Sequence, residues 1–125
     1  MDITPAVPAG RQVVESYGGG RFRVSGTSFD GSVLVLPEQT VAWDVTRLED
    51  LSPEHLRPVL DLASGIEILL LGCGPKTRPV ASELRDALRE QGISLEPMDT
   101  GAACRTYNVL LAEGRRVAAA LIAIE

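Results

Sequence analysis

The chain has 125 residues, of which 45% are hydrophobic and 23% charged, and its net charge is −5. This length and composition fit one globular domain with a core of its own, and the acidic charge argues against a nucleic-acid-binding protein, which usually presents a basic surface. No apolar run approaches the roughly 20 residues that a membrane-spanning helix needs. We therefore expect no nucleic-acid partner and no direct membrane insertion.

The N-terminus shows no targeting signal: the chain begins Met-Asp-Ile-Thr, without the basic and apolar stretches of a secretory leader. The two cysteines, Cys73 and Cys104, form no closely spaced pair, and a single histidine cannot build a histidine-rich metal site. We expect a cytoplasmic location, two free thiols, and neither metal nor cofactor.

Residues 1–11 contain two prolines and no periodic pattern, which predicts a flexible N-terminal arm in front of a single domain over residues 12–125. The first third of that domain predicts a small, largely antiparallel β-region. Three consecutive glycines suggest a hairpin turn between its first two strands, and Asp30-Gly31 is typical of a further tight turn. The strands expected here cover residues 12–17, 21–25, 33–36 and 40–43.

Helices alternate with strands after residue 50. Each expected helix opens with a capping residue or a proline, and two of them close at a glycine. They begin at Ser52-Pro53, at Pro79 and at Asp99 or Thr100, the last one ending near Glu113. Apolar runs predict buried strands at residues 66–71 and 117–124, and residues 93–97 have a strand-like pattern. The spacing predicts that all three strands are parallel and joined by right-handed crossovers. The fold class is α/β: a C-terminal β-α-β-α-β parallel unit with an N-terminal antiparallel β-region.

Glycines and polar residues gather directly after two of the predicted parallel strands. Ligands of open α/β sheets bind at the carboxyl ends of the strands, glycines permit close approach, and the first amides of a helix can bind an anion. The C-terminal half is also the less acidic one, because residues 66–125 carry a net charge of −1 against −4 for residues 1–65. The candidate ligand-binding residues are Gly72, Cys73, Gly74, Lys76, Asp99, Thr100, Arg105 and Asn108.

These residues also have purely structural interpretations, and the sequence leaves both open. The glycines around Cys73 can simply form a turn, and Asp99 or Thr100 can simply cap a helix. Cys104 fits a small buried side chain better than a nucleophile, because the only histidine, His55, lies far away in the sequence. No residue is predicted to be catalytic.

The remaining conspicuous side chains also suggest structural roles. Helical spacing predicts that Tyr107 and Leu110 are buried, and Trp43 is expected to anchor the core. His55 is expected in an exposed first helical turn, and Arg115-Arg116 at the exposed start of the last strand.

Several of these motifs together carry a resemblance to a known family. They are Phe22, Gly26, Gly31-Ser32, Pro37, Trp43, Gly72-Cys73-Gly74, Asp99-Thr100, Ala103-Cys104, Thr106-Tyr107-Asn108, Leu110 and residues 113–122. Over roughly residues 12–124 the chain resembles the Mth938-like domain family, uncharacterised bacterial and archaeal proteins related to a mitochondrial assembly factor of respiratory complex I. It departs from the family at Cys73, where threonine is common.

The resemblance implies a single three-layer α/β domain with no established catalytic residue. It also implies an accessory protein that contacts other proteins, such as an assembly partner or a subunit of a membrane complex. The first hypothesis is therefore a non-enzymatic protein-binding or assembly module. The alternative is an enzyme or sensor for a small anionic ligand, bound between the Gly72–Lys76 loop and the helix that begins near Thr100. The partner, the ligand and the oligomeric state stay open.

Overall fold

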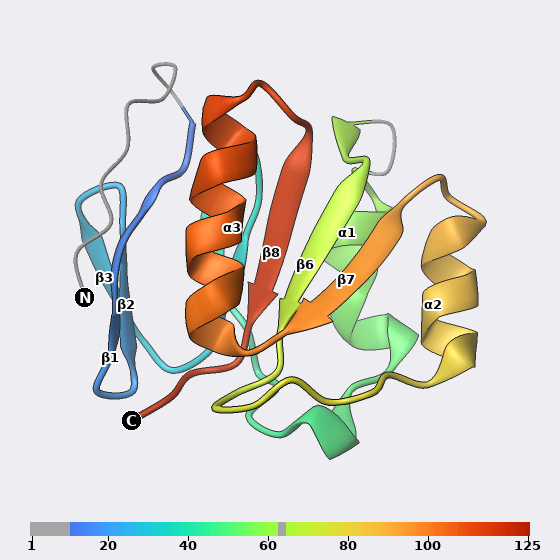
Figure 1. The fold of residues 1–125 in the computed structure, drawn as a ribbon, viewed down its shortest axis with the longest axis horizontal. Helices are drawn as coiled ribbons and strands as arrows, with labels where there is room; N and C mark the ends of the chain where they lie inside the picture. The colour runs from blue at the N-terminus through green and yellow to red at the C-terminus, as the bar shows by residue number, and fades with distance from the viewer. Residues whose placement is uncertain (1–10, 63–64) are drawn as a thin grey trace.

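The computed structural model describes residues 11–62 and 65–125, so the predicted arm lies outside the described residues except for Arg11. A five-stranded sheet forms the middle layer, with a three-stranded sheet and the longest helix on one face and the shorter helices on the other (Figure 1). The strands are β1 (Val14–Gly18), β2 (Arg21–Val24), β3 (Thr27–Asp30), β4 (Val33–Val35), β5 (Thr40–Ala42), β6 (Ile68–Gly72), β7 (Ser94–Met98) and β8 (Val117–Leu121). The helices are α1 (Arg57–Leu60), α2 (Ser82–Arg89) and α3 (Thr100–Ala112), with short 3-10 turns at Leu48–Asp50 and Pro53–Leu56.

The predicted parallel unit is confirmed. β6 pairs in parallel with β7 on one side and with β8 on the other, and α2 and α3 provide the crossovers. The sheet order is β5-β4-β8-β6-β7, which places β8 in the centre with all five of its residues buried. A strand that is covered on both faces needs apolar residues throughout, and the run Val117–Leu121 supplies them.

The strands of the middle sheet separate two hydrophobic cores. Leu69 and Leu71 of β6 pack with Leu84 and Leu88 of α2 on one face, whereas Leu70 packs with α3 and the small sheet on the other. Successive strand residues point to opposite faces, so one apolar run serves both cores. Each fully buried leucine contributes roughly 1.5–3 kcal/mol relative to an exposed one.

The antiparallel N-terminal region is confirmed, but it is divided between the two sheets. β1, β2 and β3 form the small sheet, whereas β4 and β5 join the middle sheet, where β4 pairs antiparallel with β8. The strand Thr27–Asp30 was not predicted, because three of its four residues are polar and exposed and only Phe29 is apolar. The chain bends at Gly31 (φ 85°), where a tight turn was predicted, but this bend leads from the small sheet to the middle sheet and closes no hairpin. The hairpin turn at Ser25-Gly26, between β2 and β3, was not predicted; both of its residues have positive φ (45° and 86°), as a type I′ turn requires.

Two helices differ from the prediction at their starts. The segment from Pro53 begins as a 3-10 turn and becomes α-helical only for one turn, over Arg57–Leu60. The second helix begins at Ser82 rather than Pro79, because Ala81 is extended (ψ 138°) and Val80 packs against the core from the preceding loop. No helix within residues 11–62 and 65–125 is long and apolar enough to cross a membrane.

Candidate functional site

The two predicted loops meet at the carboxyl edge of the parallel strands. Gly72, the last residue of β6, lies opposite Met98, the last residue of β7. The Cys73 amide donates to the Met98 carbonyl at 2.8 Å, and the Thr100 amide donates to the Gly74 carbonyl at 2.8 Å. The glycine loop and the start of α3 are therefore joined directly by backbone hydrogen bonds.

The Thr100 hydroxyl ties three segments together inside this crevice. It donates to the Ile122 carbonyl at 2.7 Å and accepts from the Gly74 amide at 3.0 Å, and all three residues are buried. A hydroxyl has one donor hydrogen and two acceptor lone pairs, so this one is engaged both as donor and as acceptor within the chain.

Gly72 is needed for the close approach of α3 to β6. A Cβ atom at this position would lie 3.0 Å from Thr100 Oγ1 and 3.1 Å from both Thr100 Cα and Leu121 Cδ2. Backbone atoms cannot move away as easily as the end of a flexible side chain. The space in front of Gly72 is therefore occupied by the helix itself.

Asp99 caps α3, which decides between the two capping residues that the sequence allowed. Its carboxylate accepts from the Ala102 amide at 2.9 Å, and its own amide donates to Thr77 Oγ1 at 3.1 Å. An acidic cap complements the positive end of the helix dipole. The same charge opposes an anion at this helix start, and the nearby Lys76 is exposed on its loop.

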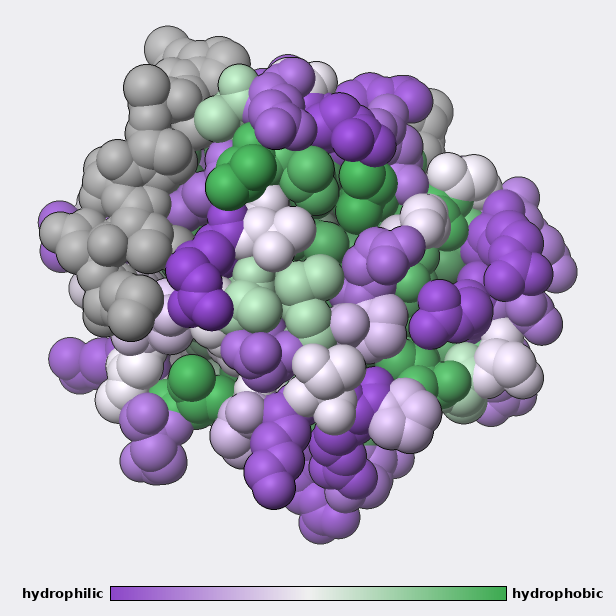
Figure 2. Space-filling model, in the orientation of Figure 1, coloured by the Kyte–Doolittle hydropathy of each residue, from purple (hydrophilic) through white to green (hydrophobic). Residues whose placement is uncertain are grey.

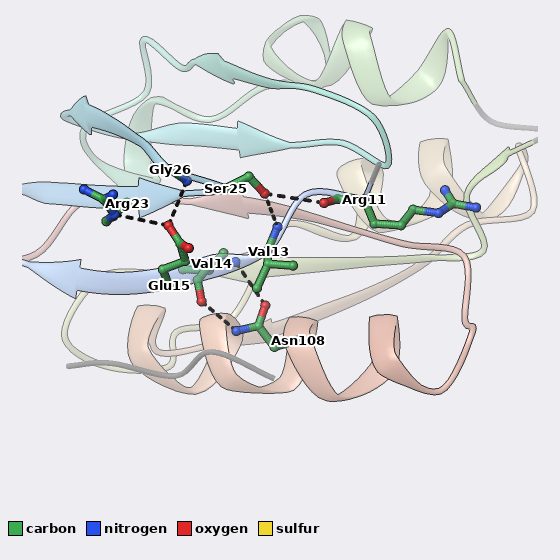
Figure 3. Close-up of polar contacts among 8 residues, drawn as sticks. All are labelled: Arg11, Val13, Val14, Glu15, Arg23, Ser25, Gly26 and Asn108. Carbon is green, nitrogen blue, oxygen red and sulfur yellow. Dashed lines mark hydrogen bonds and ion pairs between the residues drawn. The ribbon is translucent and has the colours of Figure 1, made fainter. Parts of the chain in front are cut away.

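Arg105 and Asn108 point toward the small sheet rather than into this crevice. Arg105 donates to the Tyr17 hydroxyl on β1, and that hydroxyl would lie 3.0 Å from a Cβ atom at Gly101. The buried Asn108 amide pairs with both backbone groups of Val14: Oδ1 accepts from the Val14 amide at 3.1 Å, and Nδ2 donates to its carbonyl at 2.7 Å (Figure 3). The Asn108 side chain therefore forms the two hydrogen bonds with Val14 that the backbone of a neighbouring strand would otherwise form.

Figure 3 also shows how the start of β1 is held on its other side. Glu15 accepts from the Gly26 amide at 2.8 Å and from Arg23 at 3.2 Å, and the Ser25 hydroxyl accepts from the Val13 amide at 2.9 Å. The contact between Tyr17 of β1 and Gly101 of α3 was not predicted from the sequence. The glycine at the start of this helix was the available signal for a close contact.

The two cysteines are free and buried. Burial raises the pKa of the Cys104 thiol to about 12, although Arg105 has a small effect in the opposite direction. The reactive form of cysteine is the thiolate, so Cys104 is not a nucleophile at neutral pH. Across the described ranges, no group of three His, Cys, Asp or Glu side chains could hold a metal ion.

The other side chains singled out in the sequence have structural partners. Trp43 is buried, as predicted, and its Nε1 donates to the His55 carbonyl at 2.8 Å. His55 is only partly exposed, and its Nδ1 lies 3.1 Å from the Ser52 amide, where it closes a capping box. Tyr107 is fully buried and donates to the Gln12 carbonyl at 2.8 Å, and burial raises the pKa of its hydroxyl.

The predicted buried face of α3 needs one correction. Leu110 is only partly buried, whereas its neighbour Leu111 has 4% of its surface exposed. The buried face also includes Thr100, Cys104 and Asn108. The small sheet covers α3 on a second side, which widens this face beyond the stripe that the spacing from Ala103 predicted.

Glu67 was not identified in the sequence, yet it holds both arginines that precede β8. Arg115 Nε donates to it at 2.6 Å and Arg116 Nε at 3.3 Å. These hydrogen bonds, that of Arg115 first, lower the pKa of the Glu67 carboxyl. Arg115 and Arg116 are both exposed, as predicted.

Comparison with known proteins gives consistent matches. A family described as "Protein of unknown function (DUF498/DUF598)" matches residues 14–122. NADH dehydrogenase (ubiquinone) 1 alpha subcomplex assembly factor 3 from Rattus norvegicus is 37% identical over 109 residues, which is 87% of this chain and 59% of the rat protein. The chain thus spans about three-fifths of that relative's length.

Solved structures give the same result for the fold. An outer membrane protein from Bartonella henselae superposes with a TM-score of 0.87 at 42% identity, covering 96% of this chain and all (100%) of the other. A Bordetella pertussis protein described as an Mth938-like domain gives a TM-score of 0.82 at 30% identity, covering 98% of this chain and 92% of the other. The Mth938-like resemblance noted in the sequence is confirmed.

Proposed function

The chain belongs to the DUF498/DUF598 family, and from this membership we propose that it is a non-enzymatic module that binds other proteins during the assembly of a larger complex. The observation that carries the proposal is the 37% identity to an assembly factor over 87% of this chain. By analogy with that relative's name, the complex is an NADH dehydrogenase.

The geometry of the crevice supports a non-enzymatic role. The Thr100 hydroxyl and the Asp99 carboxylate are engaged by backbone groups of the same chain. The Cys104 thiol stays protonated because burial raises its pKa to about 12. An active site usually contains a titratable group whose pKa is shifted toward its catalytic task, and the shift at Cys104 is in the opposite direction.

The surface of α3 supports protein binding. Val109 is 55% exposed, and Leu110 of the same helix, Ile68 of β6 and Met98 of β7 are partly buried. Figure 2 shows hydrophobic atoms at the surface over α3 and the adjacent strands, with hydrophilic side chains around them. Exposed apolar groups that are bordered by polar ones are typical of protein-interaction surfaces.

We also propose a cytoplasmic location, which two unpaired cysteines support because disulfides are rare in reducing compartments. The alternative function, binding of a small anion by Gly72, Cys73, Gly74, Lys76, Asp99, Thr100, Arg105 and Asn108, is weakened by the intrachain partners described above. Mapping of amide chemical shifts during titration with sulfate or phosphate tests it. Saturating shifts confined to residues 72–78 and 99–108 would support this alternative.

Deletion of the gene in its native cell tests the assembly role. We expect less fully assembled NADH dehydrogenase on native gels, an accumulation of partial complexes, and lower NADH:ubiquinone activity in membranes. Re-expression of the intact chain should restore all three. Unchanged amounts of the assembled enzyme in the deletion strain would contradict the proposal.

A further inference from the structure

Two adjoining cavities lie at the edge of the middle sheet opposite the predicted crevice. The larger one has a volume of about 600 Å³ and is lined by the β4–β5 turn, by Leu62 and Gly65 after α1, and by Arg11 and Arg116. The smaller one, of about 110 Å³, shares Arg11, Pro37 and Arg116 with it. β4 runs antiparallel to β8, so its end lies beside the start of β8, at the top of Figure 1.

The charge of these cavities differs in sign from that of the whole chain. Three arginines line them (Arg11, Arg115 and Arg116), against one carboxylate, Glu38. Glu67 pairs with two of the arginines, at 2.6 and 3.2 Å, so the described charged side chains here are three arginines and two carboxylates. The chain as a whole carries −5.

Arg11 is the most available of the three arginines. Its side chain extends away from the polar contacts around β1 in Figure 3. No carboxylate of the described residues lies within ion-pair distance of its guanidinium. A guanidinium forms bidentate hydrogen bonds with a carboxylate, which makes arginine suited to binding acidic groups.

Apart from Gln39 and Gly65, the remaining wall of the larger cavity is apolar. Leu36 and Pro37 form one side, and Leu62 lies at another. Leu62 is 42% exposed, and among the large hydrophobic side chains of the described residues only Val109 is exposed to a similar extent. A site with an apolar wall and a few convergent charged groups binds a ligand that has both characters. A free inorganic anion would leave the apolar wall uncovered.

We propose that this basic cavity binds an extended segment of a partner protein in which acidic and apolar side chains lie next to one another. The arginines hold the carboxylates, and the apolar side chains cover Pro37 and Leu62. The inference rests on the proposed function, because it adds to the exposed surface of α3 a second site through which the module contacts a protein.

Titration of the isotope-labelled full chain with defined peptides tests the site. The probe is a pool of synthetic peptides that alternate Asp or Glu with Leu, Ile or Phe, and the control pool carries Lys in place of the acids. We expect saturating amide shifts at residues 11, 36–39, 62, 65 and 114–117 with the acidic pool alone. No shifts there at millimolar peptide, or equal shifts with the lysine pool, would overturn the inference.

Charge variants make the test specific. Arg11→Glu should weaken binding of the acidic pool about tenfold or more, because it removes a charge-assisted contact and adds repulsion. Arg116→Gln, a milder change, should weaken it less. Arg89→Glu is the matched control, since its exposed side chain pairs with Asp86 on α2, outside both cavities. Equal weakening by Arg11→Glu and the control would overturn the inference.

Three further outcomes separate this inference from its alternatives. Binding to vesicles of phosphatidylglycerol that is lost in Arg11→Glu, with no peptide binding, would assign the cavity to a lipid surface and refute the peptide site. In the deletion strain, full rescue by Arg11→Glu would refute the cavity while leaving the assembly role intact. Peptide binding at the cavity, together with a deletion that leaves the assembled enzyme unchanged, would instead refute the assembly role alone.

Discussion

Replacing Thr100 with valine tests whether its hydroxyl holds the crevice together. Valine has nearly the shape of threonine, so the change removes the hydroxyl and little else. The Gly74 amide and the Ile122 carbonyl, at 3.0 and 2.7 Å from Oγ1, would lose this buried partner. A buried polar group left without a hydrogen bond costs about 1–3 kcal/mol, so the pair predicts a loss of about 2–6 kcal/mol.

That loss is large against a total stability of about 5–15 kcal/mol for a domain of ordinary size. Equilibrium unfolding in urea measures it, with the fluorescence of Trp43 as the signal, because this side chain is the only tryptophan and is buried. Thr100→Ser is the matched control: it keeps the hydroxyl and loses one methyl group, at a cost of about 0.8 kcal/mol.

Two results would refute the reasoning. A cost of Thr100→Val below about 1 kcal/mol would mean that the hydroxyl does not carry both hydrogen bonds. An equal cost for serine, which keeps the hydroxyl, and valine, which keeps the methyl group, would mean that the hydroxyl contributes no more than that methyl group. In the first case the Gly74 amide and the Ile122 carbonyl would not depend on Thr100 for a hydrogen bond.

The remaining predictions concern the buried Leu111 of α3, the Cys104 thiol and the ion pairs of Glu67. Leu111→Ala should cost about 2–4 kcal/mol in the same urea assay and clearly more than Leu110→Ala, because Leu111 is the buried one; equal costs would contradict the assignment of the helix face. In a Cys73→Ser background, the native Cys104 thiol should resist an aromatic disulfide reagent near pH 8 and react fully in denaturant, since its pKa is raised to about 12; fast labelling of the folded protein would disprove its burial. The pKa of Glu67 is lowered on folding from its ordinary 4.5. The ionised carboxylate therefore stabilises the fold above pH 4.5, and this stabilisation is lost as the pH falls through the lower pKa of the folded state. Glu67→Gln should therefore be less stable than the parent chain at neutral pH and equal to it in acid; a difference that persists in acid would show that packing is responsible.

The local sequence pattern was sufficient to predict the strands and helices of the parallel half of the molecule. The apolar runs at residues 66–71 and 117–124 are too hydrophobic for anything but strands covered on both faces, and the glycines after the helices mark where each helix ends. Gly92 and Gly114 both adopt positive φ (80°), the conformation that glycine adopts most readily.

Local pattern was insufficient where the tertiary environment decides between two acceptable structures. Thr27–Asp30 has a single apolar residue, Phe29, too little to mark it as a strand, and the Ser25-Gly26 turn brings it beside β2. Val80 forms part of a helical pattern in the sequence, yet its packing against the core keeps residues up to Ala81 out of α2.

The sequence by itself determined that the Gly72 loop lies beside the start of α3 at the carboxyl edge of the parallel strands, because strand order along the chain and strand direction place them there. Only the tertiary structure decided how those residues are used. A threonine or an asparagine can bind a ligand or a backbone group equally well, and the choice depends on what lies within hydrogen-bond distance. Here Thr100 meets Ile122 and Asn108 meets Val14, residues that are 22 and 94 positions away in the chain. No local pattern contains such separations, which arise only when the sheets and α3 pack together.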